Sequence, residues 1–116
     1  MLTSIIERLR DKRILIAGFG REGRSSLRFM QKYLPDTEVA VADKNEMSLK
    51  EIDKNKYRVY YGDEYLSSAH NYDIVIKTPG IAMNADDVAP AVISSQTDLF
   101  IEAFHSQIIG ITGTKG

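Results

Sequence analysis

The feature that most constrains this fold is a glycine-rich turn placed directly after an apolar run. In residues 13–17 an arginine is followed by four apolar residues, which predicts a strand covered on both faces, as in a parallel sheet. Residues 18–23 follow with the pattern G-x-G-x-x-G and should open a helix. In such a turn Gly18 allows the tight bend, Gly20 lets the backbone approach a diphosphate, and Gly23 lets the helix pack on the strand. Because a helix N-terminus offers N–H groups and partial positive charge, the turn predicts an anion site.

The rest of the chain alternates between strand and helix patterns. Expected helices cover residues 4–9, 23–34 and 86–95, and shorter helical segments or loops cover 44–56 and 64–69. Expected strands cover residues 13–17, 38–42, 58–61, 72–77 and 98–101. This alternation predicts an α/β fold, a Rossmann-like, doubly wound parallel sheet of about five strands.

The composition is that of an ordinary soluble domain and excludes several other classes. A chain of 116 residues can bury a core without disulfides or metals. The absence of cysteine excludes disulfide and thiol chemistry and fits a reducing compartment, so we expect a cytoplasmic location. No apolar run approaches the length of about 18 residues that a membrane span needs. A net charge of −1 with mixed signs argues against broad capture of nucleic acid or an anionic membrane.

An acidic residue follows the second expected strand at the spacing typical of nucleotide-binding sheets. Asp43 lies about 20 residues beyond Gly23, where a carboxylate can accept hydrogen bonds from a ribose hydroxyl or a base N–H. Ligands of such sheets bind outside the carboxyl ends of the strands. Because a carboxylate close to a diphosphate repels it, we expect the Glu22 side chain to turn outward. The predicted nucleotide site contains Gly18, Gly20, Arg21, Glu22, Gly23 and Asp43.

The other polar positions give weaker indications. Residues 62–63 and 78–80 follow the third and fourth expected strands, and their turns can either face a ligand or serve only the backbone. His70 and His105 have no suitably spaced acidic partners for a metal site or a catalytic triad. We therefore predict no catalytic residue and no metal ligand in this chain.

The C-terminal segment is typical of the start of a variant phosphate-binding loop. Residues 110–116 read Gly-Ile-Thr-Gly-Thr-Lys-Gly, with Ile111 where the first glycine of the standard loop belongs. The alternative is a tail rich in glycine and threonine. Because only the strand and the turn of such a loop are present, we interpret the chain as a fragment. The partial ATP site contains Gly113, Thr114, Lys115 and Gly116.

These segments together resemble the N-terminal domain of the Mur ligases, in particular the members that add D-glutamate. The resemblance covers nearly the whole chain. It implies one domain over residues 1–107 and the start of a missing ATPase domain over 108–116, whose first strand, 108–112, has lost its sheet partners. It rests on the glycine-rich turn, Asp43, residues 78–81, residues 101–104 and the terminal loop.

The resemblance implies a function for the parent enzyme and for this part of it. The N-terminal domain of such a ligase holds the UDP end of UDP-N-acetylmuramoyl-L-alanine. Backbone N–H groups of Arg21 and Glu22 face the diphosphate. The remaining implied substrate contacts are Asp43, Lys44 and Asn45 beside the uridine, and Thr78, Pro79 and Gly80 along the same cleft.

The parent would use ATP and Mg²⁺ to form an acyl phosphate, which the amine of D-glutamate then attacks. The resemblance places the groups for ATP transfer, Mg²⁺ and D-glutamate beyond Gly116. This chain alone is therefore expected to be inactive, to bind no cofactor, and to contact neither nucleic acid nor membrane.

Two other classes also fit the glycine-rich turn and Asp43. One is a regulatory module that senses NAD(H) or ATP, resembling those that gate potassium transport. The other is the cofactor domain of an NAD-dependent dehydrogenase. Neither accounts for residues 110–116.

Overall fold

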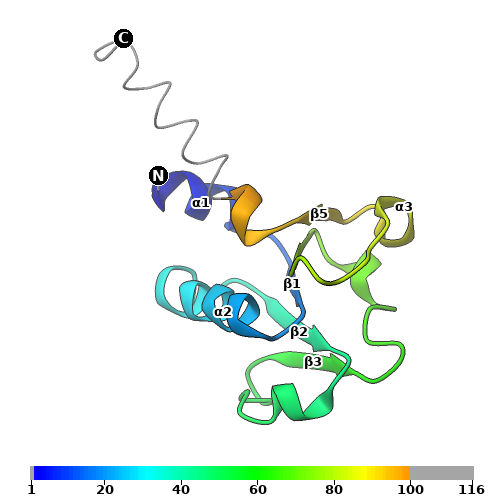
Figure 1. Cartoon of the computed structure of the whole chain (residues 1–116). Coiled ribbons are helices and arrows are strands. Elements are labelled where there is room, and N and C mark those ends of the chain that lie inside the picture. Colours follow the sequence, from blue (N-terminus) through cyan, green and yellow to red (C-terminus); the bar gives the residue numbers. More distant parts are fainter. Residues whose placement is uncertain (1, 100–116) are drawn as a thin grey trace.

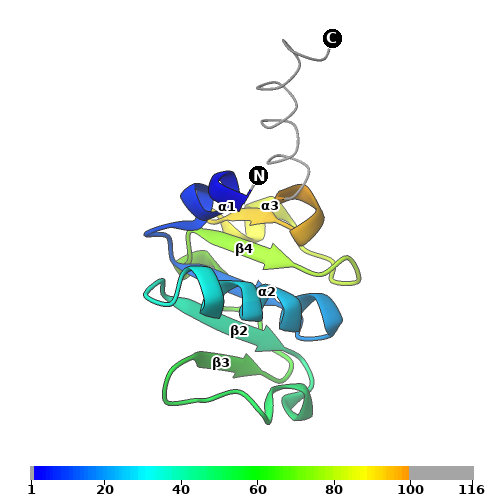
Figure 2. The same ribbon diagram turned by 90° about the vertical axis from the view of Figure 1, so that its left-hand side faces the viewer.

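A computed structural model of the chain describes residues 2–99. Five strands form one parallel sheet in the order β3-β2-β1-β4-β5 (Figures 1 and 2). The strands are β1 (Ile14–Ala17), β2 (Val39–Asp43), β3 (Arg58–Tyr61), β4 (Ile74–Lys77) and β5 (Val92–Ser94). The α-helices are α1 (Leu2–Leu9), α2 (Arg21–Tyr33) and α3 (Ala85–Val88), and the short 3-10 helices are η1 (Glu46–Leu49) and η2 (Ala69–Asn71). The predicted fold class is confirmed.

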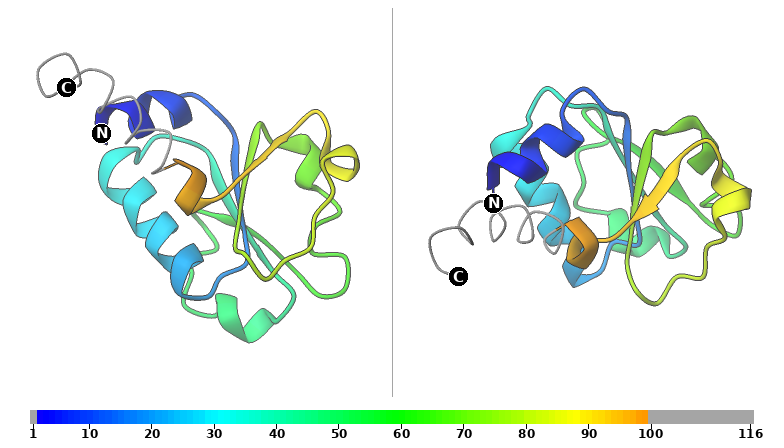
Figure 3. Two further views of the ribbon diagram at one scale, coloured as in Figure 1. Left: turned by 45° about the horizontal axis from the view of Figure 1, so that its top comes forward. Right: turned by 90° about the horizontal axis from the view of Figure 1, so that it is seen from above.

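Segments cover both faces of the sheet, as a doubly wound fold requires. Figure 3 shows α1 and α2 on one side and α3 on the other. Alternate residues of the central strand enter two separate cores: Ile14 and Ile16 pack with α1 and α2, whereas Leu15 and Ala17 pack beneath η2 and α3. All four β1 side chains are fully buried. This explains the continuous apolar run in the sequence, because a strand covered on both faces has no polar side.

Of the helix expected over residues 86–95, only residues 86–88 are helical, and the described part of the strand expected over 98–101 is helical instead. Helix α3 ends at Val88, because proline at 90 disfavours helical backbone at the preceding Ala89, whose ψ is 143°. Residues Val92–Ser94 then form the edge strand β5. Asp98, expected in a strand, lies in a helical turn that begins after Ser95, whose hydroxyl accepts a hydrogen bond from the Asp98 N–H at 3.0 Å. Residues 100 and 101 of the expected strand lie outside the described residues.

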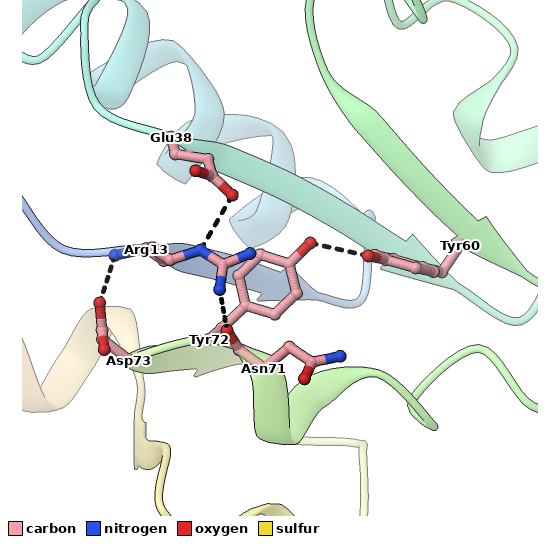
Figure 4. Close-up of polar contacts among 6 residues, drawn as sticks. All are labelled: Arg13, Glu38, Tyr60, Asn71, Tyr72 and Asp73. Atoms are coloured by element: carbon pink, nitrogen blue, oxygen red, sulfur yellow. Dashed lines mark hydrogen bonds and ion pairs between the residues drawn. The ribbon is translucent and has the colours of Figure 1, made fainter.

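Arg13 joins three strands at the amino end of the sheet (Figure 4). Its backbone N–H donates to the carboxylate of Asp73 at 2.7 Å. Its guanidinium donates to Glu38 at 3.0 Å and to the carbonyl of Asn71 at 2.6 Å, and lies over the ring of Tyr72. The beginnings of β1, β2 and β4 are therefore held together by one residue.

A tyrosine pair lies beside this cluster. The hydroxyls of Tyr60 and Tyr72 are 2.8 Å apart, and the two rings meet edge to face (Figure 4). Burial raises the pKa of Tyr72 above its ordinary value, and the hydrogen bond with Tyr60 raises this pKa further. The folded protein thus holds the phenolic proton more tightly than the unfolded chain does.

This proton linkage predicts a loss of stability in alkali. The Tyr72 hydroxyl adds its full contribution to the free energy of unfolding below about pH 10, where unfolded tyrosines are protonated. This contribution declines as the pH rises above that value. The free energy of unfolding in urea should fall less between about pH 9 and about pH 11 for Tyr72→Phe than for the unsubstituted chain. Tyr61→Phe, at an exposed position of β3, is the control and should leave the decline unchanged. Equal declines for Tyr72→Phe and the unsubstituted chain would contradict the assignment.

Within residues 2–99, no helix has the length and apolar character needed to cross a membrane.

Candidate functional site

A hollow of about 440 Å³ opens at the carboxyl edge of the sheet. It lies where β1 and β4 neighbour each other and their connections leave in opposite directions along the sheet, the place where ligands of doubly wound sheets bind. Its walls come from the turns after four strands. The lining residues are Gly18, Phe19, Gly20, Arg21, Glu22, Asp43, Lys44, Tyr65, Thr78, Gly80 and Ile81.

The glycines of the first turn are required by close backbone contacts. Gly18 has a φ of +93°, and a Cβ there would lie 2.5 Å from the Thr78 hydroxyl oxygen. A Cβ on Gly23 would collide with the carbonyl oxygen of Gly18. By contrast, among the residues that the structure describes, no atom lies within 4 Å of a Cβ built on Gly20, so this residue faces open space. The turn after β1 is therefore packed on its protein side and open towards the hollow.

Helix α2 starts at this open side. Gly20 is its N-cap residue, and no side chain of the described part of the chain caps the first turn. The first N–H groups of an α-helix have no partner within the helix, and together with the helix dipole they attract an anion. Lys44 and Arg21 contribute positive charge to the lining, whereas Asp43 and Glu22 contribute negative charge. Because these charges offset each other, an anion must be held chiefly by the backbone of the turn and helix.

Asp43 connects the ends of β1 and β2. One carboxylate oxygen accepts a hydrogen bond from the Phe19 N–H at 2.8 Å, and the other accepts one from the Asn45 N–H at 2.8 Å. A carboxylate has about four acceptor positions, so both oxygens can also accept from a ligand. Asp43 therefore shapes the glycine-rich turn as well as facing the hollow, a role that its spacing in the sequence did not indicate.

The structure brings most of the sequence-predicted UDP contacts to this one hollow. Glu22, whose side chain we expected to turn outward, is half-buried and contributes to the lining. Gly23 lies behind the turn, against β1. The predicted contacts that do not line the hollow are Gly23, Asn45 and Pro79. The predicted ATP contacts Gly113, Thr114, Lys115 and Gly116, the strand 108–112 and His105 lie outside the described residues, and the exposed His70 is not part of the lining.

Three lining residues were missed from the sequence. Phe19 is buried, with the guanidinium of Arg24 over its ring at 4.7 Å, and it anchors the turn to the core. Ile81 follows the turn after β4, and Tyr65 lies in the loop after β3. Burial raises the pKa of the Tyr65 hydroxyl, and the charge of Asp43 raises it further. The only indication of Ile81 and Tyr65 in the sequence is their position, since both residues follow strand ends.

A larger hollow of about 530 Å³ lies at the amino edge of the sheet, beside Arg13. Two of its cationic side chains already have hydrogen-bond partners within the protein. Arg13 binds Glu38 and the carbonyl of Asn71, and Lys54 donates to the carbonyl of Leu49 at 3.0 Å. Within residues 2–99, this edge also lacks the helix N-terminus and glycine turn that mark the carboxyl edge. We therefore assign the functional site to the smaller hollow.

The sheet order and the carboxyl-edge hollow define a Rossmann-like α/β domain. Comparison with known proteins narrows this class. The chain is 30% identical, over 97% of its length, to the UDP-N-acetylmuramoylalanine–D-glutamate ligase of Ligilactobacillus salivarius. It is 31% identical over 91% of its length to the enzyme of that name from Marinobacter nauticus, and 25% identical over 93% to that of Clostridium acetobutylicum.

Over nearly its whole length, the chain is thus a homologue of the UDP-N-acetylmuramoylalanine–D-glutamate ligases, consistent with their N-terminal domain. The resemblance predicted from the sequence is confirmed. The chain spans about a quarter of the length of these curated relatives. No family model matches the chain, and no solved structure matches it.

Proposed function

We propose that this chain binds the uridine diphosphate part of UDP-N-acetylmuramoyl-L-alanine, as the N-terminal domain of a peptidoglycan ligase that adds D-glutamate. The observation that carries the proposal is the meeting of an uncapped helix start, an open glycine turn and Asp43 around one hollow. The substrate is taken from the relatives, which are named as ligases of UDP-N-acetylmuramoylalanine and D-glutamate.

The lining residues suit the parts of this ligand. The first turn of α2 and the open backbone at Gly20 would hold the diphosphate. Asp43 would accept from a ribose hydroxyl or from the base N–H, since both its oxygens keep acceptor capacity. Lys44, exposed beside it, would border the uridine. Thr78 and Gly80 would border the ligand on the β4 side.

The whole ligase would also need ATP, Mg²⁺ and a site for D-glutamate. We propose that other domains provide these, and that residues 113–116 begin the ATP-binding loop. On this proposal the 116-residue chain binds the nucleotide end of the substrate without catalysing amide formation, and the enzyme works in the cytoplasm.

An NMR titration of the 116-residue chain tests the proposal against the NAD-binding alternatives. UDP and UDP-N-acetylmuramoyl-L-alanine should shift the amide signals of Gly20, Arg21, Asp43 and Gly80, since these residues line the hollow. NADH and ATP are the comparison ligands. Shifts at these amides with NADH or ATP, and none with UDP, would instead support a sensor or dehydrogenase domain.

A further inference from the structure

Tyr65 is the aromatic side chain best placed to meet a ligand in the carboxyl-edge hollow. The lining contains two aromatic residues, Phe19 and Tyr65. Phe19 is 5% exposed and its ring lies beneath Arg24, so it serves the core. Tyr65 is half-buried, which leaves part of its surface open.

The backbone fixes Tyr65 beside the end of β2. The Gly62 N–H donates to the carbonyl of Lys44 at 3.1 Å, which ties the loop after β3 to the loop after β2. Gly62 has a φ of +90°, a conformation that favours glycine. The Tyr65 N–H donates back to the carbonyl of Gly62 at 3.3 Å, which closes the turn. The tyrosine is therefore held by a defined turn next to Asp43 and Lys44.

The order of the strands predicts how a bound nucleotide runs along the carboxyl edge of the sheet. The helix start that suits a diphosphate follows β1, Asp43 ends β2, and Tyr65 follows β3, the next strand outward. Neighbouring strands are about 4.8 Å apart, so the β3 loop lies about 10 Å along the sheet edge from the end of β1. A nucleotide with its phosphates at α2 and a ribose hydroxyl at Asp43 would place its base beyond β2, over this loop. On the opposite side, the lining residues Thr78, Gly80 and Ile81 offer no aromatic surface.

We propose that the ring of Tyr65 stacks on the pyrimidine base of bound UDP and supplies most of the affinity that this domain has for the base. The inference rests on the function proposed above and adds the element that recognises the nucleoside. Stacking of a base on an aromatic ring stabilises complexes of single-stranded nucleic acids by about 1–3 kcal/mol per base. Because the backbone that carries the ring is already held by its turn, the loop loses little freedom on binding, which favours the contact.

The test compares Tyr65→Leu and Tyr65→Phe with the unsubstituted 116-residue chain. Tyr65→Leu should weaken UDP binding about tenfold and leave the binding of inorganic diphosphate unchanged, because the diphosphate has no base to stack. Tyr65→Phe keeps the ring and should bind UDP within about twofold of the unsubstituted chain. Tyr61→Leu, on the exposed end of β3, is the matched control and should bind normally. Titration calorimetry and NMR shifts give the affinities, and NOEs between the uracil protons and the Tyr65 ring report the stacking directly.

The outcomes separate this inference from the proposed function. Unchanged UDP binding by Tyr65→Leu, or an equal loss for UDP and diphosphate, would overturn the stacking role while leaving UDP as the ligand. Failure of the unsubstituted chain to bind UDP would overturn the proposed function and this inference together. Circular dichroism of each variant confirms that the fold is retained.

Discussion

Replacing Gly23 by alanine is expected to destabilise the fold by about 2 kcal/mol or more. The added Cβ would collide with the carbonyl oxygen of Gly18 and come within 3.4 Å of the Ile16 side chain. The first of these is a backbone atom in a turn fixed by β1, so it cannot move aside as the end of a flexible side chain could. Alanine gains about 1 kcal/mol over glycine in helix propensity, which the collision outweighs. Urea unfolding followed by circular dichroism measures the difference.

The control for this substitution is Gly20→Ala, three residues earlier in the same turn. A Cβ at Gly20 meets no atom of the described residues within 4 Å, so the free energy of unfolding should fall by no more than about 1 kcal/mol, the cost of alanine in place of glycine at an N-cap. Because that Cβ points into space that the ligand needs, Gly20→Ala should nevertheless weaken UDP binding. Equal stability of the two variants would contradict the packing role assigned to Gly23.

Asp43→Ala is expected to impair both stability and binding. Without the carboxylate, the partly buried Phe19 N–H loses its acceptor, which costs about 1–3 kcal/mol. The ligand also loses a charged acceptor, so UDP affinity should fall about tenfold to a hundredfold. Unfolding in urea and calorimetric titration with UDP measure the two effects separately.

Two further variants separate the roles of Asp43. Asp43→Asn retains one carbonyl oxygen that can accept from Phe19, and should therefore recover part of the stability but little of the binding. Asp63→Ala removes the same charge from an exposed position in the loop after β3, and should change neither. If Asp43→Ala bound UDP as tightly as Asp63→Ala does, Asp43 would have only its structural role.

The fold was predictable where strands are apolar runs that end in a turn. Strand β1 runs directly into Gly18, and β3 and β4 likewise end at Gly62 and Thr78. Strand β5 was not predictable in the same way. It has three residues, its Val92 is 49% exposed, and it lies between a proline and a capping serine whose effects are local. A short edge strand contributes little apolar pattern to the sequence.

The candidate site was predictable only as far as local spacing determines it. The glycine turn and Asp43 follow a pattern with fixed intervals, and the structure places them together. Tyr65 depends instead on how the loop after β3 folds back onto the carbonyl of Lys44, a contact between segments that no interval in the sequence specifies. Asn45, by contrast, takes part in a local turn: its N–H donates to Asp43, two residues earlier, which makes Asn45 a support for the carboxylate.

The cluster around Arg13 has a consequence for assembly of the site at the far end of the sheet. Its partners lie 25 to 60 positions away along the chain, and they can be reached only when β1, β2 and β4 start at the same level. A slip of one residue between two of these short strands would separate the partners and also turn each side chain to the wrong face. The strands contain four or five residues, so alignment at their starts fixes where they end. Arg13 therefore fixes the register of these three strands. The register in turn places Gly18, Asp43 and Thr78 level with one another at the carboxyl edge, although Arg13 lies at the opposite edge.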